Sequence, residues 1–188
     1  MNKKSFLTAS TLALAISTAT TAVYSAELEE IIVTAQKRAE SLQDVPISMS
    51  ALSGSTIKDN GIHSFQDLSG YVPNLEIAEN AVNTIITMRG IGIGSNQSFE
   101  QSVGIYVDGV HFGKSRQVRS GLFDVEQVEV LRGPQGILFG KNTLAGAINV
   151  TTASANVGDE FSGGIDVSQE SYNGQIVDAH IAGSVTDN

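Results

Sequence analysis

A short strand that runs directly into a glycine-punctuated loop is the feature that most constrains the fold of this chain. Val128 to Leu131 has the β-branched, apolar character of a strand, and Arg132 follows it immediately. The loop after it contains Gly133, Pro134, Gly136 and Gly140. Glycine permits positive φ and close backbone approach, and proline stiffens the chain, so we expect a loop of defined shape. A second strand-like run, Gly146 to Thr152, predicts that this loop joins two strands.

The glycine-rich segments do not have the spacing of nucleotide-binding loops. A P-loop requires four residues between its glycines, followed by Lys and then Ser or Thr. Here three residues separate Gly136 from Gly140, and Asn142 follows Lys141. The segment that begins at Gly90 also lacks the third glycine of a dinucleotide fingerprint at its required position. These glycines therefore indicate tight turns. Any function is expected from the residues that the turns hold in place.

Length, charge and cysteine content exclude several classes of protein. The chain has 188 residues, enough for one domain with a core of its own. It contains no cysteine, which excludes a disulfide framework and a thiolate metal site. Its net charge of −9 argues against nucleic acid as a partner. Together with 19 glycines, these properties favour a loop-rich domain with a small core.

No catalytic residue, metal site or cofactor is predicted. The three histidines are far apart in the sequence and lack the spacing of metal ligands. A hydrolase could be imagined on Asp108, Glu126 and Glu129. No nucleophile–base pair or acid–base pair accompanies these acids, so we do not expect an enzyme.

The N-terminus has the pattern of a targeting segment. Lys3 and Lys4 precede a short apolar stretch, Phe6 to Ile16, which is too short to span a bilayer as a helix. Small residues follow, and cleavage after Ala22, Ser25 or Ala26 fits the pattern, with an uncleaved anchor as the alternative. We expect residues 1–26 to be a signal peptide and the protein to be exported.

Strands and short helices alternate along the rest of the chain, which predicts an α+β fold with a small mixed sheet. The predicted strands are residues 45–52, 84–88, 103–107, 127–131 and 146–152. Short helices are expected at residues 55–60, after an N-cap at Ser64, and as a single turn over residues 122–126. Asp108 and Gly109 form a strong tight-turn signal directly after one of these strands.

The C-terminal residues read as a hairpin with two different faces. Phe161 to Glu170 and Gln175 to Thr186 are separated by a turn signal, and apolar residues alternate with polar ones along both runs. The length matches the roughly 9–11 residues that a tilted membrane strand needs. A soluble hairpin with one solvent-exposed face would show the same alternation. The pattern alone therefore leaves open whether this is a membrane hairpin or a soluble one.

Several motifs, in order, resemble the plug domain of a TonB-dependent outer-membrane receptor. They are the strand and loop from Val128 to Gly140, the run from Met88 to Gly92, and the turn from Val107 to Gly109. The resemblance extends from about Glu29 to the C-terminus. It implies a TonB box and linker over residues 27–40 and a plug domain over residues 41–154. Residues 160–188 would then be the first two antiparallel strands of an incomplete transmembrane β-barrel, with the chain an N-terminal fragment of a longer receptor.

A β-branched run near the N-terminus is the candidate partner-binding strand. It comprises Glu30, Ile31, Ile32, Val33, Thr34 and Ala35. Such a run prefers an extended backbone, and near a terminus it has no obvious partner in its own fold, so it can add to another protein's sheet. An ordinary first strand of the domain is the alternative. The resemblance implies a TonB box that pairs with TonB and, through it, with the inner-membrane energy complex.

Two arginines at strand ends, Arg89 and Arg132, are candidate anchors. Each precedes a glycine, and a surface arginine exposed to solvent is the common alternative. The resemblance implies that both face glutamates of the barrel wall and lock the plug, because a guanidinium fork suits carboxylates. Without those glutamates we expect both side chains to be mobile or solvated.

Two loops are the candidate ligand contacts, with plain solvated loops as the alternative. Their residues are Gly92, Gly94, Ser95, Asn96, Gln97, Phe99, Phe112 and Arg116. The resemblance implies import of a scarce solute, by default a ferric siderophore, by a receptor in the lipid of the cell outer membrane, with plug and TonB box on the periplasmic side. A free-standing periplasmic binding or signalling domain that ends near Ser154 is the rival interpretation.

Overall fold

The computed structural model describes residues 30–81, 83–94, 100–154, 160–169 and 174–184. The predicted signal peptide, residues 1–26, lies outside these ranges. So do four of the predicted ligand-loop residues, Ser95, Asn96, Gln97 and Phe99.

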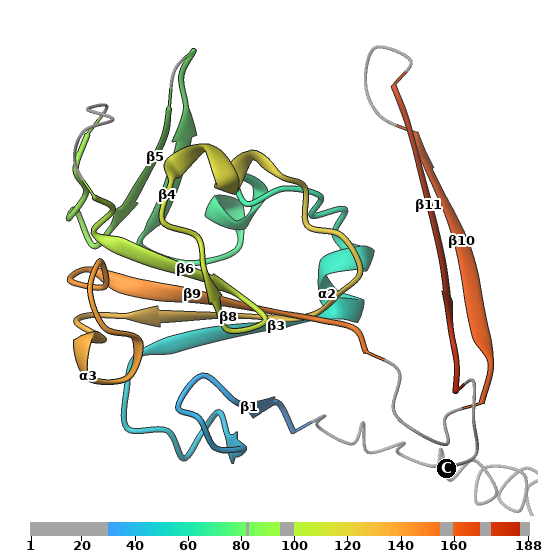
Figure 1. The fold of residues 1–188 in the computed structure, drawn as a ribbon, viewed down its shortest axis with the longest axis horizontal. Helices are drawn as coiled ribbons and strands as arrows, with labels where there is room; N and C mark the ends of the chain where they lie inside the picture. The colour runs from blue at the N-terminus through green and yellow to red at the C-terminus, as the bar shows by residue number, and fades with distance from the viewer. Residues whose placement is uncertain (1–29, 82, 95–99, 155–159, 170–173, 185–188) are drawn as a thin grey trace, which may run out of the picture.

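A five-stranded mixed sheet forms the centre of the fold (Figure 1). Its strands, in spatial order, are β3 (Met49–Ser53), β8 (Val125–Arg132), β9 (Gly146–Thr152), β6 (Val103–Val107) and β7 (Val110–His111). β9 runs parallel to β6, and the other neighbours are antiparallel. The predicted α+β class with a small mixed sheet is confirmed.

A hairpin and three short helices pack on this sheet to form the main core. The hairpin consists of β4 (Leu75–Glu79) and β5 (Thr84–Met88), and the helices are α2 (Gly54–Asp59), η1 (Asp67–Gly70) and η2 (Ser115–Arg119). A further helical turn, α3 (Gly136–Phe139), lies in the loop between β8 and β9. Phe65, Leu68, Ile86, Val128 and Ile148 are buried together in this core.

Local signals account for the first two helices. The Ser53 side chain accepts the amide of Thr56 at 3.3 Å and caps α2, as its residue type favours. Gly61 has a φ of 61° and ends the segment, as predicted. In the next helix the carboxylate of Asp67 accepts the amide of Ser64 at 2.8 Å. The buried side chains at 65 and 68 follow from this start.

Predictions about two elements need correction, and other elements were not predicted. β3 begins at Met49 instead of Val45, because Pro46 has no amide hydrogen to contribute to a ladder. β4 was not predicted and pairs along its whole length with β5. The helical turn predicted for residues 122–126 is wrong, because Asp124 adopts a φ of 48° and the chain enters β8 at Val125.

The C-terminal hairpin stands beside α2, apart from the sheet (Figure 1). It consists of β10 (Ser162–Gln169) and β11 (Gln175–Ala182), paired antiparallel in continuous register. Most of its apolar side chains point away from the rest of the protein, and Ile165, Val167, Val177 and Ile181 are 63–74% exposed. Ile176, paired with Ser168, is the exception and shares the inner face. The polar alternate positions of β10 face α2, since Asp166 contacts Lys58 there. The hairpin therefore turns its apolar face outward.

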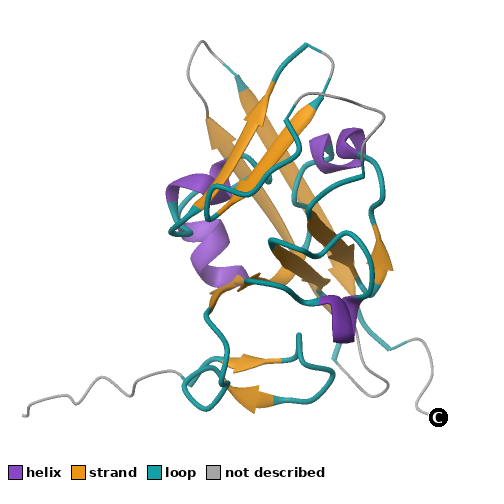
Figure 2. Ribbon diagram, turned by 90° about the vertical axis from the view of Figure 1, so that its left-hand side faces the viewer, coloured by secondary structure: helices purple, strands orange, loops and turns teal. Residues whose placement is uncertain are grey.

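The N-terminal residues form a separate small sheet of β1 (Ile32–Val33) and β2 (Glu40–Ser41). It lies below the central sheet in both views (Figure 1, Figure 2). Among the described residues, none of the helices has the length and apolar character needed to cross a membrane.

Candidate functional site

The candidate TonB box, Glu30 to Ala35, is folded against the domain. Its strand β1 pairs with β2, and the amide of Leu42 donates to the carbonyl of Ile31 at 2.9 Å. Val33 and Ala35 are buried, at 1% and 2% exposure. Only Ile32–Val33 of the run forms a strand, and Ala35 already lies in a turn, so the extended part is shorter than predicted. The expectation that the run has no partner within its own fold is wrong.

A buried carboxylate, Glu129, contacts the end of this segment. One of its oxygens accepts the backbone amides of Thr34 and Ala35, the latter at 3.2 Å. The other accepts the side-chain amide of Asn149 on β9 at 2.7 Å. Sequence reasoning considered Glu129 only as a hydrolase acid, and an acid flanked by valines inside a buried strand was the available signal that it needs partners.

Arg132 ends β8 and is held within the domain. Its guanidinium donates to the Ser48 hydroxyl at 3.1 Å, the Pro73 carbonyl at 3.3 Å, the Met49 carbonyl at 2.9 Å and the Ser50 hydroxyl at 3.0 Å. The side chain is half-buried. The expectation that it is mobile or solvated is therefore wrong for Arg132.

Arg89 lies in a strained turn next to Arg132. The turn joins Met88 to Ile91, and Arg89 and Gly90 have φ values of 51° and 78°, as a type I′ turn requires. Desolvation lowers the pKa of Arg132, and the nearby charge of Arg89 lowers it further. Among the described residues, no carboxylate oxygen lies within 4.0 Å of either guanidinium. Two like charges thus lie together without a described counter-ion.

The described ligand-loop residues differ in their surroundings. Gly92 is exposed, but a Cβ there would lie 2.6 Å from the Thr87 hydroxyl, so glycine allows the close approach. Gly94 and Arg116 are exposed. Phe112 is partly buried and packs on the core, so its ring is less available than the prediction assumed.

The second predicted loop is attached to the end of the β4–β5 hairpin through η2. The Ser115 hydroxyl lies 3.1 Å from the Asn83 side-chain oxygen. Arg119 donates to the Thr84 hydroxyl at 3.4 Å and lies 4.0 Å from the Glu79 carboxylate. Arg116 therefore lies on a helix that is itself fixed to the hairpin.

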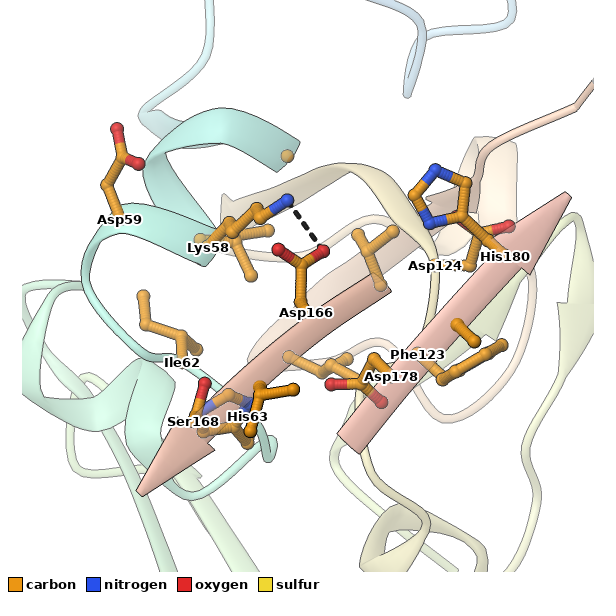
Figure 3. A pocket seen from close by; sticks show the side chains of 16 residues that line it. Lys58, Asp59, Ile62, His63, Phe123, Asp124, Asp166, Ser168, Asp178 and His180 are labelled. Carbon is orange, nitrogen blue, oxygen red and sulfur yellow. Dashed lines mark ion pairs between the residues drawn. The ribbon is translucent and has the colours of Figure 1, made fainter. Parts of the chain in front are cut away.

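A cavity of about 420 Å³ separates α2 from the C-terminal hairpin (Figure 3). Lys58 of α2 forms an ion pair with Asp166 of β10 at 2.7 Å across it. Asp166 is paired in register with Asp178 of β11. His180, from the same strand, also lines the cavity. The hairpin thus faces the domain with acidic and polar groups, and Lys58 offsets part of their charge.

Comparisons with known proteins agree with these features. A model of the TonB-dependent Receptor Plug Domain family matches residues 41–147. The pesticin receptor of Yersinia pestis is 32% identical over 83% of this chain and 24% of its own length. The probable TonB-dependent siderophore receptor PiuA of Acinetobacter baumannii is 26% identical over 70% of this chain and 17% of its own length.

Solved structures have the same fold. The crystal structure of the ferric yersiniabactin uptake receptor FyuA from Yersinia pestis superposes with a TM-score of 0.67 and 31% identity, covering 75% of this chain and 22% of that one. The ferripyoverdine receptor of the outer membrane of Pseudomonas aeruginosa superposes with a TM-score of 0.68 at 18% identity, which supports the fold alone. It covers 84% of this chain and 20% of that one. The chain belongs to the family of TonB-dependent receptor plug domains.

Proposed function

We propose that this chain supplies the TonB box and plug of an outer-membrane receptor that imports a scarce nutrient with energy from TonB. The relatives are transport receptors, and the chain spans 24% of the length of the pesticin receptor. In this proposal the plug closes the lumen of a complete barrel, and the TonB box lies on the periplasmic side.

The observation that carries the proposal is the orientation of the β10–β11 hairpin. A soluble hairpin would turn its apolar residues toward the domain and its polar residues toward water. Here Ile165 and Val177 are 74% and 63% exposed, while Asp166 faces Lys58 of α2. An apolar outer face with a polar inner face is the arrangement of a strand pair in a membrane barrel. It also argues against a free-standing periplasmic domain that ends near Ser154.

The arginine pair supports a plug anchored inside a barrel. Two adjacent guanidiniums repel each other, and they gain most from carboxylates that approach both. Arg89 has a strained backbone conformation, and strained residues cluster at binding sites. This supports a role of Arg89 in binding a partner in addition to forming the turn. We infer that glutamates of the barrel wall supply these carboxylates.

A ferric siderophore is the proposed substrate. The relatives include a receptor named for ferric yersiniabactin uptake and another named as a siderophore receptor. A vitamin B12 transporter of Vibrio vulnificus, 29% identical over 68% of this chain, makes cobalamin the second substrate to test. Gly92, Gly94 and Arg116 are the described residues that we assign to ligand contact.

Nutrient uptake by cells that express the complete receptor tests the proposal. Ile32→Pro removes an amide donor from the proposed TonB box, and Ile32→Ala keeps it. We expect Ile32→Pro to lower uptake of radiolabelled iron by roughly tenfold or more, and Ile32→Ala to have a small effect. Binding of the ferric siderophore to the cell surface should be the same in both variants.

Two results would contradict the proposal. Full uptake by the Ile32→Pro receptor would show that the segment does not couple to TonB. If the wild-type receptor takes up no ferric catecholate, no ferric hydroxamate and no cobalamin, that result refutes the proposed substrate classes.

A further inference from the structure

Glu129 is a buried acid without a described cationic partner. Its side chain is completely buried, and among the described residues no lysine, arginine or histidine nitrogen lies within 4.0 Å of it. A carboxylate in such a position is costly unless hydrogen-bond donors surround it. Its neighbours Val128 and Val130 face the main core, so Glu129 points from the opposite face of the sheet.

The N-terminal segment supplies most of the donors to this carboxylate. The amides of Thr34 and Ala35 donate to one oxygen, and Asn149 donates to the other. Hydrogen bonds to a charged acceptor are roughly twice as strong as neutral ones. When the segment leaves, Glu129 loses two of its three described donors.

Further backbone groups of the segment are also occupied. The carbonyl of Ile32 accepts the side-chain amide of Gln127 at 3.0 Å. The carbonyl of Ile31 accepts the amide of Leu42, and β1 pairs with β2 at Ile32 and Val33. Addition of a strand from another protein requires a free backbone edge. The docked segment therefore has to leave the plug before it can pair with TonB.

We propose that Glu129 is the positioning residue that holds residues 31–35 on the plug and sets the fraction of receptors whose segment is available to TonB. This inference rests on the proposed role of residues 30–35 as the TonB box. Glu129 lies on β8, the strand that ends at Arg132, and its partner Asn149 lies on β9. The contact thus joins the N-terminal segment directly to the two central strands of the plug.

The test follows the segment with and without TonB in the complete receptor. A nitroxide on Thr34→Cys reports docking, because this side chain is exposed while its backbone amide contacts Glu129. The present chain has no cysteine, and any cysteine elsewhere in the receptor is replaced first. Glu129→Ala removes the acceptor, and Glu129→Gln keeps its volume but not its charge. Glu126→Ala, an exposed acid on the same strand, is the matched control.

We expect Glu129→Ala to raise the mobile fraction of the label by roughly tenfold or more, and Glu129→Gln by roughly two- to fivefold. The control should match the wild type. The apparent affinity for the purified C-terminal domain of TonB should rise by the same factors, because a larger fraction of receptors is competent to bind. The volume-preserving glutamine variant keeps the test valid if the alanine variant does not fold.

The two proposals fail in different ways. A label that is as immobile in both Glu129 variants as in the wild type, or equally mobile in the control, overturns the role of Glu129 even if TonB binds. A label released in the Glu129 variants with no TonB binding to any receptor supports the role of Glu129 and overturns the assignment of the TonB box.

Discussion

Replacement of the two neighbouring arginines should change the stability of the plug in opposite directions. Arg89→Asn converts the Arg-Gly turn into Asn-Gly, the pair that type I′ turns favour. Arg132→Met keeps the aliphatic stem and removes the guanidinium with its four hydrogen bonds. The comparison separates the contribution of each arginine to the fold from its proposed contribution to anchoring.

The structure sets the size of each effect. A left-handed conformation costs an ordinary residue about 1–2 kcal/mol, and asparagine relieves part of this cost. Arg89→Asn also removes the positive charge that lowers the pKa of Arg132. We expect it to raise the free energy of unfolding by about 0.5–1 kcal/mol. Loss of four partly exposed hydrogen bonds at about 0.5–1.5 kcal/mol each predicts that Arg132→Met lowers the free energy of unfolding by about 2–6 kcal/mol.

Urea unfolding followed by circular dichroism measures both changes. Lys37→Asn is the matched control, because Lys37 is also exposed and basic, with a φ of 65°. It should stabilise the chain as Arg89→Asn does. In the complete receptor, only the Arg89 and Arg132 variants should raise pore conductance under load, by releasing the plug.

Destabilisation by Arg89→Asn of the same size as by Arg132→Met would refute the reasoning about the strained turn. Unchanged conductance in both single variants and in the double variant would mean that the arginines serve only the internal structure of the plug.

Two further predictions concern the core and its pH dependence. Gly146→Ala places a Cβ 2.2 Å from the Met88 sulfur and should lower the free energy of unfolding by about 1–3 kcal/mol. The control Gly136→Ala, with no heavy atom within 4 Å of its Cβ, should leave the free energy of unfolding unchanged. Equal urea midpoints for the two variants would contradict this prediction. Burial raises the pKa of Tyr106 above 10.0, so unfolded chains lose this proton first and stability should fall as the pH rises through and above 10. Tyr106→Phe should reduce this fall, and an ultraviolet titration in which every tyrosine ionises at its ordinary pKa would contradict the prediction.

The sequence by itself determined those turns and strands whose conformation is set by residues close together in the chain. β9 has the predicted bounds, and the turn at Asp108 and Gly109 has φ values of 49° and 78°. The alternation along β10 and β11 could also be predicted from the sequence. These features follow from backbone preferences and side-chain periods over a few residues.

Only the tertiary structure decided which groups meet across the chain. Glu129 accepts an amide 95 residues away, and Arg132 donates to a hydroxyl 84 residues away. The alternation of the C-terminal hairpin is the same whether its apolar face points inward or outward, and its position beside Lys58 decided between them. Local preferences specify the shape of a segment, but the partners of its polar groups depend on strand order and register, which arise only when the whole sheet assembles.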